Sequence, residues 1–175
     1  MVMSFRCQAL GMAGRGQDAA ACEALLLGRL DQRADLPGAQ AAADDNLRRL
    51  ALARLLLDQP EPALALLGRM SPAAPDQATS RARLQAEAYR LLAQAQRGQA
   101  EPAAAAALAG SIGLLPADGF EYGDVCVALA AQARLAGDAA GAERHLRDLA
   151  SRYPEGEVPA RFEAMAERAR RIIAQ

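Results

Sequence analysis

Residues 129–154 read LAAQARLAGDAAGAERHLRDLASRYP and carry the clearest helical pattern in the chain. Apolar residues recur at steps of three and four on both sides of Gly137-Asp138, as they do along one face of a helix. Glycine followed by aspartate is a turn signal. Pro154 ends the second pattern, because proline has no amide donor to continue a helix. The stretch therefore predicts a helix hairpin, two helices joined by a tight turn.

The same hairpin pattern recurs along the chain. An alanine follows a short Gly, Pro or Asp turn at Ala21, Ala63, Ala103 and Ala142, at steps of 42, 40 and 39 residues. A period near forty with helical patterns throughout is typical of stacked helix hairpins. The expected hairpins span residues 3–31, 39–70, 77–114 and 120–152, and a closing helix spans 158–174. We therefore expect one all-α domain over residues 1–175.

The composition favours helices over strands. The chain is 52% hydrophobic and only 3% aromatic, and alanine, the best helix former, dominates it. One broad apolar stripe must be buried, and it consists of Leu47, Leu50, Leu52, Leu55 and Leu56. The segment EPAAAAALAG at residues 101–110 has unusually small side chains, so we expect its helix to lie tightly between neighbouring helices.

The charges exclude several classes of function. The chain has 20 basic and 21 acidic residues. It has neither a basic face nor a long charge run, so we expect no direct binding of nucleic acid. All 20 basic residues are arginine. Without lysine the chain has neither a Schiff base nor a phosphate-binding GxxxxGK motif, and we expect no cofactor.

The three cysteines predict no special chemistry. Cys7, Cys22 and Cys126 are odd in number and unrelated in spacing, which indicates neither a disulfide framework nor a CxxC metal site. We expect buried, reduced thiols. The N-terminal residues show no signal-peptide core, and no window approaches the roughly 18 apolar residues of a membrane span. The sequence therefore predicts a cytoplasmic protein that does not enter a membrane.

No group of residues predicts catalysis or metal binding. His145 is the only histidine and has no Cys or His three or four positions away, so we expect a surface histidine on a second helix. Asp44-Asp45 stands three and four positions before Arg48 and Arg49, the spacing of ion pairs on a solvated helix face. We expect a protein that is not an enzyme.

The hairpin pattern resembles the tetratricopeptide superfamily. The matching residues of the last hairpin are Leu129-Ala130, Ala133, Gly137-Asp138, Ala142, Leu146, Leu149 and Pro154. The second hairpin repeats Leu50-Ala51, Ala63, Leu67, Met70 and Pro75, with Asp58 in place of the turn glycine and Arg54 at a small groove position. The third keeps Gly98 and Ala103. The resemblance implies a right-handed superhelix of about four hairpins with a capping helix at residues 158–174.

The long period makes the chain resemble one branch of the superfamily more than the others. It exceeds the 34 residues of the standard repeat, and LALARLLLDQPEPALALLGRM at residues 50–70 looks like the long-helix repeats of MalT-type bacterial transcriptional regulators. Those regulators combine such an array with an ATPase module and a DNA-binding domain. The chain carries motifs of neither, so it would be a detached array, a fragment or a stand-alone relative.

The resemblance also implies a binding groove. In tetratricopeptide arrays the first helix of each pair lines the concave side. By register the lining residues are Asp45, Arg48, Leu52 and Leu55, then Gln85, Ala88, Leu92 and Ala95, then Asp124, Val127, Ala131 and Arg134. The Lys and Asn clamp that holds chaperone C-termini is absent. The implied groove is mostly apolar, with Arg48 and Arg134 as candidate anion anchors.

A short aromatic segment offers a second candidate site. Residues 115–122, LPADGFEY, contain Phe120 and Tyr122 in a chain poor in aromatic residues. Either Phe120 pins a loop between hairpins, or the two aromatics anchor a partner, since aromatics are favoured at interface hot spots.

Three functions remain open at this point. The preferred one is a protein-interaction scaffold that binds a protein or peptide in its groove. The first alternative is a regulatory fragment of a MalT-like regulator that senses a small-molecule effector. The second is a chaperone or secretion adaptor that shields an amphipathic helix of a client. A homo-oligomer is compatible with all three.

Overall fold

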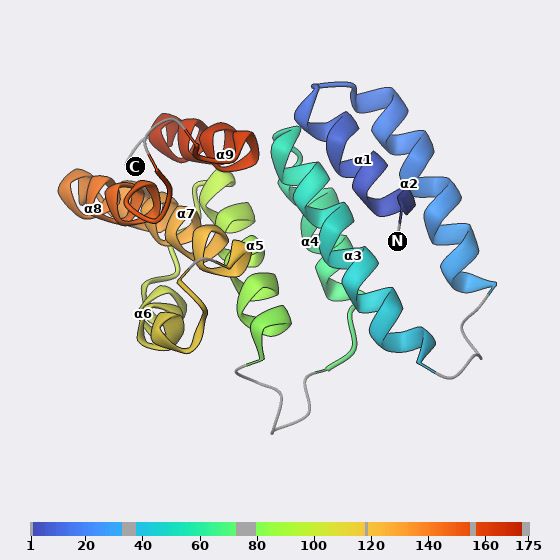
Figure 1. Ribbon diagram of the computed structural model, residues 1–175, viewed down its shortest axis with the longest axis horizontal. Coiled ribbons are helices and arrows are strands. Elements are labelled where there is room, and N and C mark those ends of the chain that lie inside the picture. The colour runs from blue at the N-terminus through green and yellow to red at the C-terminus, as the bar shows by residue number, and fades with distance from the viewer. Residues whose placement is uncertain (1, 33–37, 73–79, 118, 155–156, 173–175) are drawn as a thin grey trace. The chain divides into compact units, whose positions relative to one another are not determined.

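The computed structural model describes residues 2–32, 38–72, 80–117, 119–154 and 157–172, and within them every regular element is helical (Figure 1). The helices are α1 (Val2–Met12), α2 (Gly16–Asp31), α3 (Ala39–Leu56), α4 (Pro60–Gly68), α5 (Arg81–Gln96), α6 (Pro102–Ser111), α7 (Phe120–Leu135), α8 (Ala139–Ala150) and α9 (Ala160–Arg171), with a short 3-10 helix η2 (Ile112–Leu114). The all-α prediction is confirmed. The predicted start of the third hairpin at residue 77 and the predicted end of the closing helix at residue 174 lie outside the described residues.

The chain divides into two compact units. Unit 1 spans Met1–Pro72 and holds α1 to α4, and unit 2 spans Ala73–Gln175 and holds α5 to α9. The division falls between the second and third predicted hairpins. Whether the two units form one domain stays a prediction.

All four hairpins turn in the same way. Two residues after the end of each first helix the backbone is left-handed, at Gly14, Asp58, Gly98 and Gly137, with φ of 68°, 54°, 73° and 81°. In the last hairpin the amide of Gly137 donates to the carbonyl of Arg134 (3.1 Å), and the amide of Asp138 donates to the carbonyl of Ala133 (2.9 Å). The same two hydrogen bonds recur at the other three turns, and together they form a Schellman motif. The four hairpin turns therefore share one backbone conformation.

The repeated turn corrects one alanine of the predicted period. Counted from the left-handed residue, Ala63, Ala103 and Ala142 are each the fifth residue on; Ala63 and Ala142 are buried, whereas Ala103 is exposed. The residue at this place in the first hairpin is Ala19, which is 4% exposed, and not the exposed Ala21. The sequence pattern placed Ala21 there because α2 is rich in alanine on several faces.

A pair of glycine substitutions tests this turn. Gly137→Ala should lower the free energy of unfolding by about 1 kcal/mol, because an L-residue is strained in the left-handed region. Gly110→Ala is the matched control, since a Cβ on that residue of α6 meets open space. It should be stabilising by about 0.5 kcal/mol, because alanine is the better helix former. Urea unfolding of both variants gives the two values, and equal effects would contradict the proposed strain.

Unit 1 has an apolar interior built on α3. This helix packs against α1 and α4, and α1 also packs against α2. The predicted leucine stripe is buried, as expected. Arg54 of α3 donates two hydrogen bonds to Glu23 of α2, at 2.7 and 2.9 Å, and a third to Gln59. Arg54, which occupies a small groove position in the family register, therefore joins α2 and α3 as an ion pair.

A disulfide between Cys7 and Cys22 contradicts the expectation of reduced thiols. The two residues face each other across α1 and α2, with their Cα atoms 5.5 Å apart. Cys7 lies five positions before the end of α1 and Cys22 six positions after the start of α2. In a hairpin, residues equally far from the turn lie opposite each other. The placement of the two cysteines on either side of the turn could have predicted the disulfide, whereas their separation in sequence alone could not.

The disulfide predicts a pattern of thiol reactivity and stability. The folded chain should show no thiol reactive toward a disulfide reagent, because Cys126 is buried. Unfolding should expose one thiol, and unfolding with reduction should expose three. The double variant Cys7→Ser, Cys22→Ser should lose about 3 kcal/mol of stability, since the bond closes a loop of 15 residues. Three reactive thiols in the unreduced, unfolded chain would contradict the pairing.

Unit 2 is organised around α7. The helices α5, α6, α8 and α9 all pack against it, and residues 122–132 of α7 are all buried. The alanine-rich α6 differs from the prediction, because only Leu108 of this helix is buried and most of its alanines are exposed. Small side chains give α6 little apolar area with which to fill a position between neighbours, so it lies at the surface.

In the described parts of the chain, no helix has the length and apolarity needed to cross a membrane.

Candidate functional site

Two predicted groove residues meet in a buried polar cluster of unit 2. Asp124 of α7 is fully buried, and its Oδ2 accepts three hydrogen bonds. The donors are Gln85 Nε2 (2.5 Å) and Tyr89 OH (2.9 Å) from α5, and Arg161 Nη2 (2.7 Å) from α9. Burial raises the pKa of Asp124, while the charge of Arg161 and the hydrogen bonds act in the opposite direction. The cluster joins three helices through one carboxylate oxygen.

The other predicted groove residues of unit 2 lie in the same interior. Leu92 is 1% exposed and Val127 is fully buried, as are Ala88 and Ala131, whereas Arg134 near the end of α7 is half-buried. In the structure these positions of α5 and α7 form a packing interface between first helices. The reason is that α5 and α7 pack against each other and that α9 packs on α7 as well. An open groove is therefore not formed at these residues.

In unit 1 the predicted groove residues divide into a salt bridge and core. Asp45 accepts hydrogen bonds from Arg48 (2.5 Å) and from Arg49 (2.9 Å), which confirms the expected ion pairs. Leu52 and Leu55 are each 1% exposed. Arg48 thus already holds a carboxylate, and its role as an anion anchor stays a prediction.

The two predicted aromatic anchors have different environments. Phe120, the first residue of α7, is 53% exposed. The guanidinium of Arg161 lies 4.4 Å from the centre of its ring and 4.5 Å from that of Phe162. Such a cation between two aromatic rings is attracted by both. Phe120 therefore presents an exposed aromatic face beside a positioned arginine at the junction of α7 and α9.

Tyr122 is instead part of a contact between α7 and α8. Its hydroxyl donates to Asp148 Oδ2 (2.5 Å) and accepts from Arg152 (2.9 Å), and it is 8% exposed. Burial, together with Asp148, raises the pKa of Tyr122, and the same two causes raise the pKa of Cys126 to about 12. The Cys126 thiol therefore stays protonated, which makes it a poor nucleophile.

Sequence reasoning missed the residues that attach α9 and the third hairpin to α7. The Phe162 ring lies over Gly123, where a Cβ would come within 2.4 Å of it. Gln132 of α7 donates to the carbonyl of Leu91 (2.8 Å) and accepts from the amide of Glu101 (2.8 Å). In the sequence, Gly123 and Gln132 stand out within a largely apolar helix, but the sequence does not show which residues they contact.

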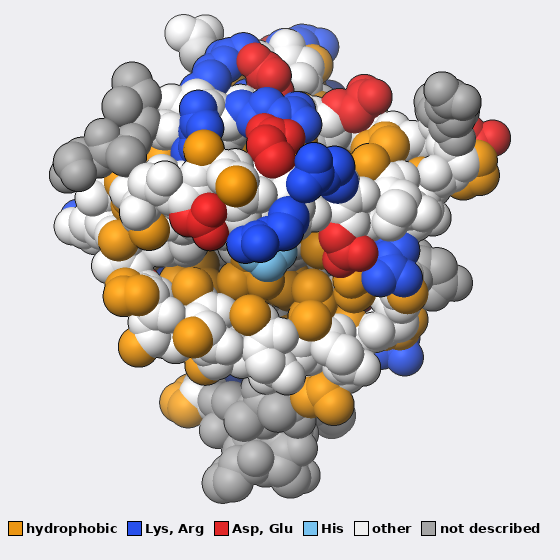
Figure 2. Space-filling model, turned by 90° about the vertical axis from the view of Figure 1, so that its left-hand side faces the viewer, with side chains coloured by type: hydrophobic (Ala, Val, Ile, Leu, Met, Phe, Trp, Pro, Cys, Tyr) orange, Lys and Arg blue, Asp and Glu red, His pale blue; other side chains and the backbone are white. Residues whose placement is uncertain are grey.

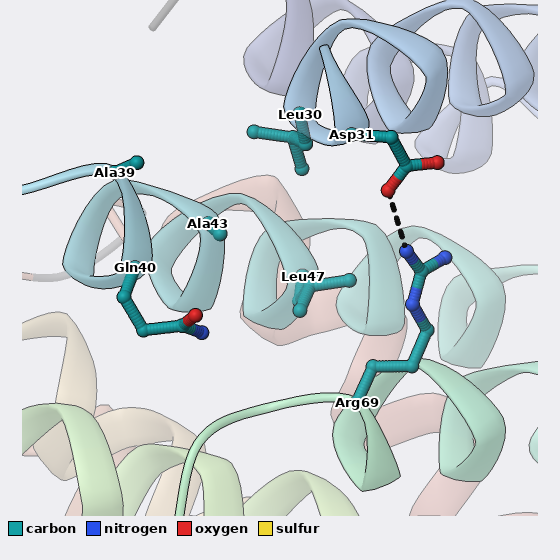
Figure 3. Close-up of a pocket in the computed structure, with 7 residues that line it drawn as sticks. All are labelled: Leu30, Asp31, Ala39, Gln40, Ala43, Leu47 and Arg69. Carbon is teal, nitrogen blue, oxygen red and sulfur yellow. Dashed lines mark hydrogen bonds and ion pairs between the residues drawn. The ribbon is translucent and has the colours of Figure 1, made fainter. Parts of the chain in front are cut away.

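Unit 1 contains a small pocket between α2, α3 and the end of α4 (Figure 3). Its volume is about 140 Å³, and it is lined by Leu30, Asp31, Ala39, Gln40, Ala43, Leu47 and Arg69. Leu30, Ala39, Ala43 and Leu47 form its apolar part, and Asp31 pairs with Arg69 at 3.2 Å. The pocket has room for an aliphatic side chain or a small molecule, with one charge of each sign beside it.

His145 of α8 is half-buried and lies at a boundary between two kinds of surface. In Figure 2 mixed acidic and basic side chains lie above it, and a band of apolar side chains lies below it. Burial, and secondarily Arg144, lowers its pKa. In the part of the chain that the structure describes, no group of three or more His, Cys, Asp or Glu residues is placed to hold a metal ion.

The lowered pKa of His145 predicts a loss of stability at mildly acidic pH. The unfolded chain binds a proton at its ordinary pKa of about 6.5, whereas the folded chain binds it only at lower pH. Stability is therefore fully present above pH 6.5 and falls as the pH drops through this range. NMR titration of the single imidazole should show the lowered pKa. His145→Gln should remove this part of the pH dependence, and an unchanged curve would contradict the assignment.

Comparisons with protein-family models, with curated proteins and with solved structures gave no match to this chain.

Proposed function

We propose that the chain is a non-enzymatic helical-repeat module that binds a protein or peptide partner. The observation that supports this most directly is the Schellman turn that all four described hairpins share. Stacked equivalent hairpins expose extended surfaces and serve binding in repeat proteins. A right-handed superhelix of tetratricopeptide type, with α9 as its capping helix, is the arrangement that we propose for them.

The surface that best suits a partner is the exposed ring of Phe120 at the start of α7. Aromatic residues and arginine are the residues most enriched at binding hot spots. The Phe120 ring is held by the guanidinium that stacks on it, so little side-chain entropy is lost when a partner contacts the ring. Unit 2 therefore offers a preorganised anchor.

A capture experiment tests this proposal. The full chain, immobilised, is exposed to native lysate of its source organism, and bound proteins are identified by mass spectrometry. We expect a partner that is retained by Leu25→Glu, a control at a 64% exposed leucine of unit 1, and lost at least tenfold with Phe120→Glu. Circular dichroism checks that both variants keep their helices. Equal capture by both variants, or no specific capture, would count against the proposal.

The pocket of unit 1 supports a second candidate, the binding of a small effector. Its apolar lining residues and the Asp31–Arg69 pair would suit a molecule with an aliphatic part and two opposite charges, such as an amino acid. Thermal shifts of the chain with free amino acids, compared with an Ala43→Leu variant that fills the pocket, test this candidate. A shift that persists in the variant would exclude the pocket as the site.

The disulfide bears on the compartment. Disulfides persist in oxidising compartments and are rare in the cytoplasm, so Cys7–Cys22 favours a site of action outside it, contrary to the sequence-based prediction. This weighs against a MalT-like transcriptional regulator and favours the secretion or envelope adaptor. Trapping of free thiols in intact cells, followed by mass spectrometry of the peptides that contain Cys7 and Cys22, tests this point.

A further inference from the structure

We infer that α9 occupies a helix-binding face of α7, and that the partner is an amphipathic helix that replaces α9. This inference deepens the proposed function and rests on it. The face is defined by Phe120, Gly123 and Asp124 of α7 together with Gln85 and Tyr89 of α5. It binds an arginine and an aromatic ring at successive positions of a helix, which are Arg161 and Phe162 in α9.

The contacts of α9 show the chemistry that this face recognises. The Arg161 guanidinium enters a site with a buried carboxylate below it and the Phe120 ring beside it. The Phe162 ring fills the space that the missing side chain of Gly123 leaves free. Met165, Ala166 and Ala169 continue the buried stripe at helical spacing. A matching partner helix therefore carries Arg-aromatic, followed by apolar or small residues three, four and seven positions after the aromatic residue.

The attachment of α9 is of a kind that a competing helix can replace. Among the described helices, α9 packs mainly on α7, whereas α7 itself is held on several sides. The outward face of α9 is polar, with Glu163, Glu167, Arg170 and Arg171 exposed. Its polar anchor is a buried salt bridge, which adds geometric selectivity more than stability. An incoming arginine would restore the same salt bridge, so the exchange leaves no buried charge unpaired.

Because α9 belongs to the same chain, a partner helix must compete with it for the face of α7. A tethered helix has an effective concentration of the order of millimolar. A free helix of equal affinity at micromolar concentration would therefore displace little of it. The face stays covered unless a partner offers additional contacts or α9 is weakened.

The experiment uses a fluorescent peptide of residues 158–172 as the probe and the full chain as the receptor. Binding is measured by anisotropy to the wild-type chain, to Phe162→Ala, and to Phe162→Ala with Met165→Ala. We expect at least tenfold tighter binding to the variants, because their own α9 competes less. Peptides that carry Arg161→Glu or Phe162→Ala should bind the variants at least tenfold more weakly than the native peptide. These peptide changes leave the folding of the receptor untouched.

Hydrogen exchange of α9 in the same variants decides the remaining outcomes. If the α9 amides stay as protected in both variants as in the wild type, α9 is a fixed part of the core and the inference is overturned. It is also overturned if α9 is released and the peptide does not bind, or if the Arg161→Glu peptide binds equally well. An exchanged dimer of wild-type chains would assign the face to a second copy instead. Phe120-dependent capture from lysate without peptide binding would overturn this inference alone, whereas peptide binding without capture would count against the proposed function.

Discussion

The Phe162→Ala variant should unfold with a free energy about 3–5 kcal/mol lower than that of the wild type. Phe162 is fully buried, and it is the largest side chain that α9 places against α7. Its removal takes away apolar contacts and leaves a cavity above Gly123, which has no side chain to fill it. Urea unfolding followed by circular dichroism measures the loss. A loss below about 1 kcal/mol would mean that α9 contributes little to the stability of unit 2.

The effect of Gly123→Ala on stability should change sign when Phe162 is replaced by alanine. In the wild-type chain Gly123→Ala is destabilising, because the new Cβ would lie within 2.4–2.8 Å of Phe162 ring atoms. In the Phe162→Ala chain the same change removes a helical glycine without a clash and should stabilise by about 0.5–1 kcal/mol. The double-mutant cycle thus gives a strong coupling between the two positions. Additive effects would contradict the observed contact.

The second large effect is expected at Asp124. Asp124→Leu should lower stability by about 3–5 kcal/mol, because it leaves the Arg161 cation in a mostly buried site without its carboxylate. Gln85 and Tyr89 lose the same acceptor. The double variant Asp124→Leu, Arg161→Met should recover most of the loss, because no uncompensated charge is then buried. The control is Asp18→Leu, whose salt bridge with Arg15 is exposed and should contribute no more than about 1 kcal/mol.

A double variant as unstable as Asp124→Leu alone would contradict this explanation. It would indicate that Gln85 and Tyr89, and not the arginine, depend on the carboxylate. Urea unfolding of the four chains measures all the differences needed.

The helices could be predicted because their signals are local. Gly98 and Gly137 end first helices through left-handed backbone, and Pro60 and Pro102 start second helices, so each boundary depends on residues within one turn. Buried leucines followed from their periodicity for the same reason. Asp58 shows the limit of this approach. It lies in the left-handed region, where glycine is the expected residue, so its identity did not predict its conformation.

The candidate site could not be predicted because its signals are distant in sequence. Asp124 is the single charged residue inside a long apolar segment, which indicates a buried partner but does not name it. Arg161 lies 37 positions further on and reaches Asp124 only because α9 folds back onto α7. The family register placed Asp124 on an open concave side, and nothing local to α7 could show that another helix covers it.

The distribution of chromophores between the two units makes their unfolding separable by optical spectroscopy. The chain has no tryptophan, and its three tyrosines, Tyr89, Tyr122 and Tyr153, all lie in unit 2. The disulfide lies in unit 1. Tyrosine emission therefore reports on unit 2 alone, while far-ultraviolet dichroism reports on the helices of both units. A reducing agent should therefore shift the unfolding transition of unit 1, seen by dichroism, and leave the tyrosine-emission transition of unit 2 unchanged.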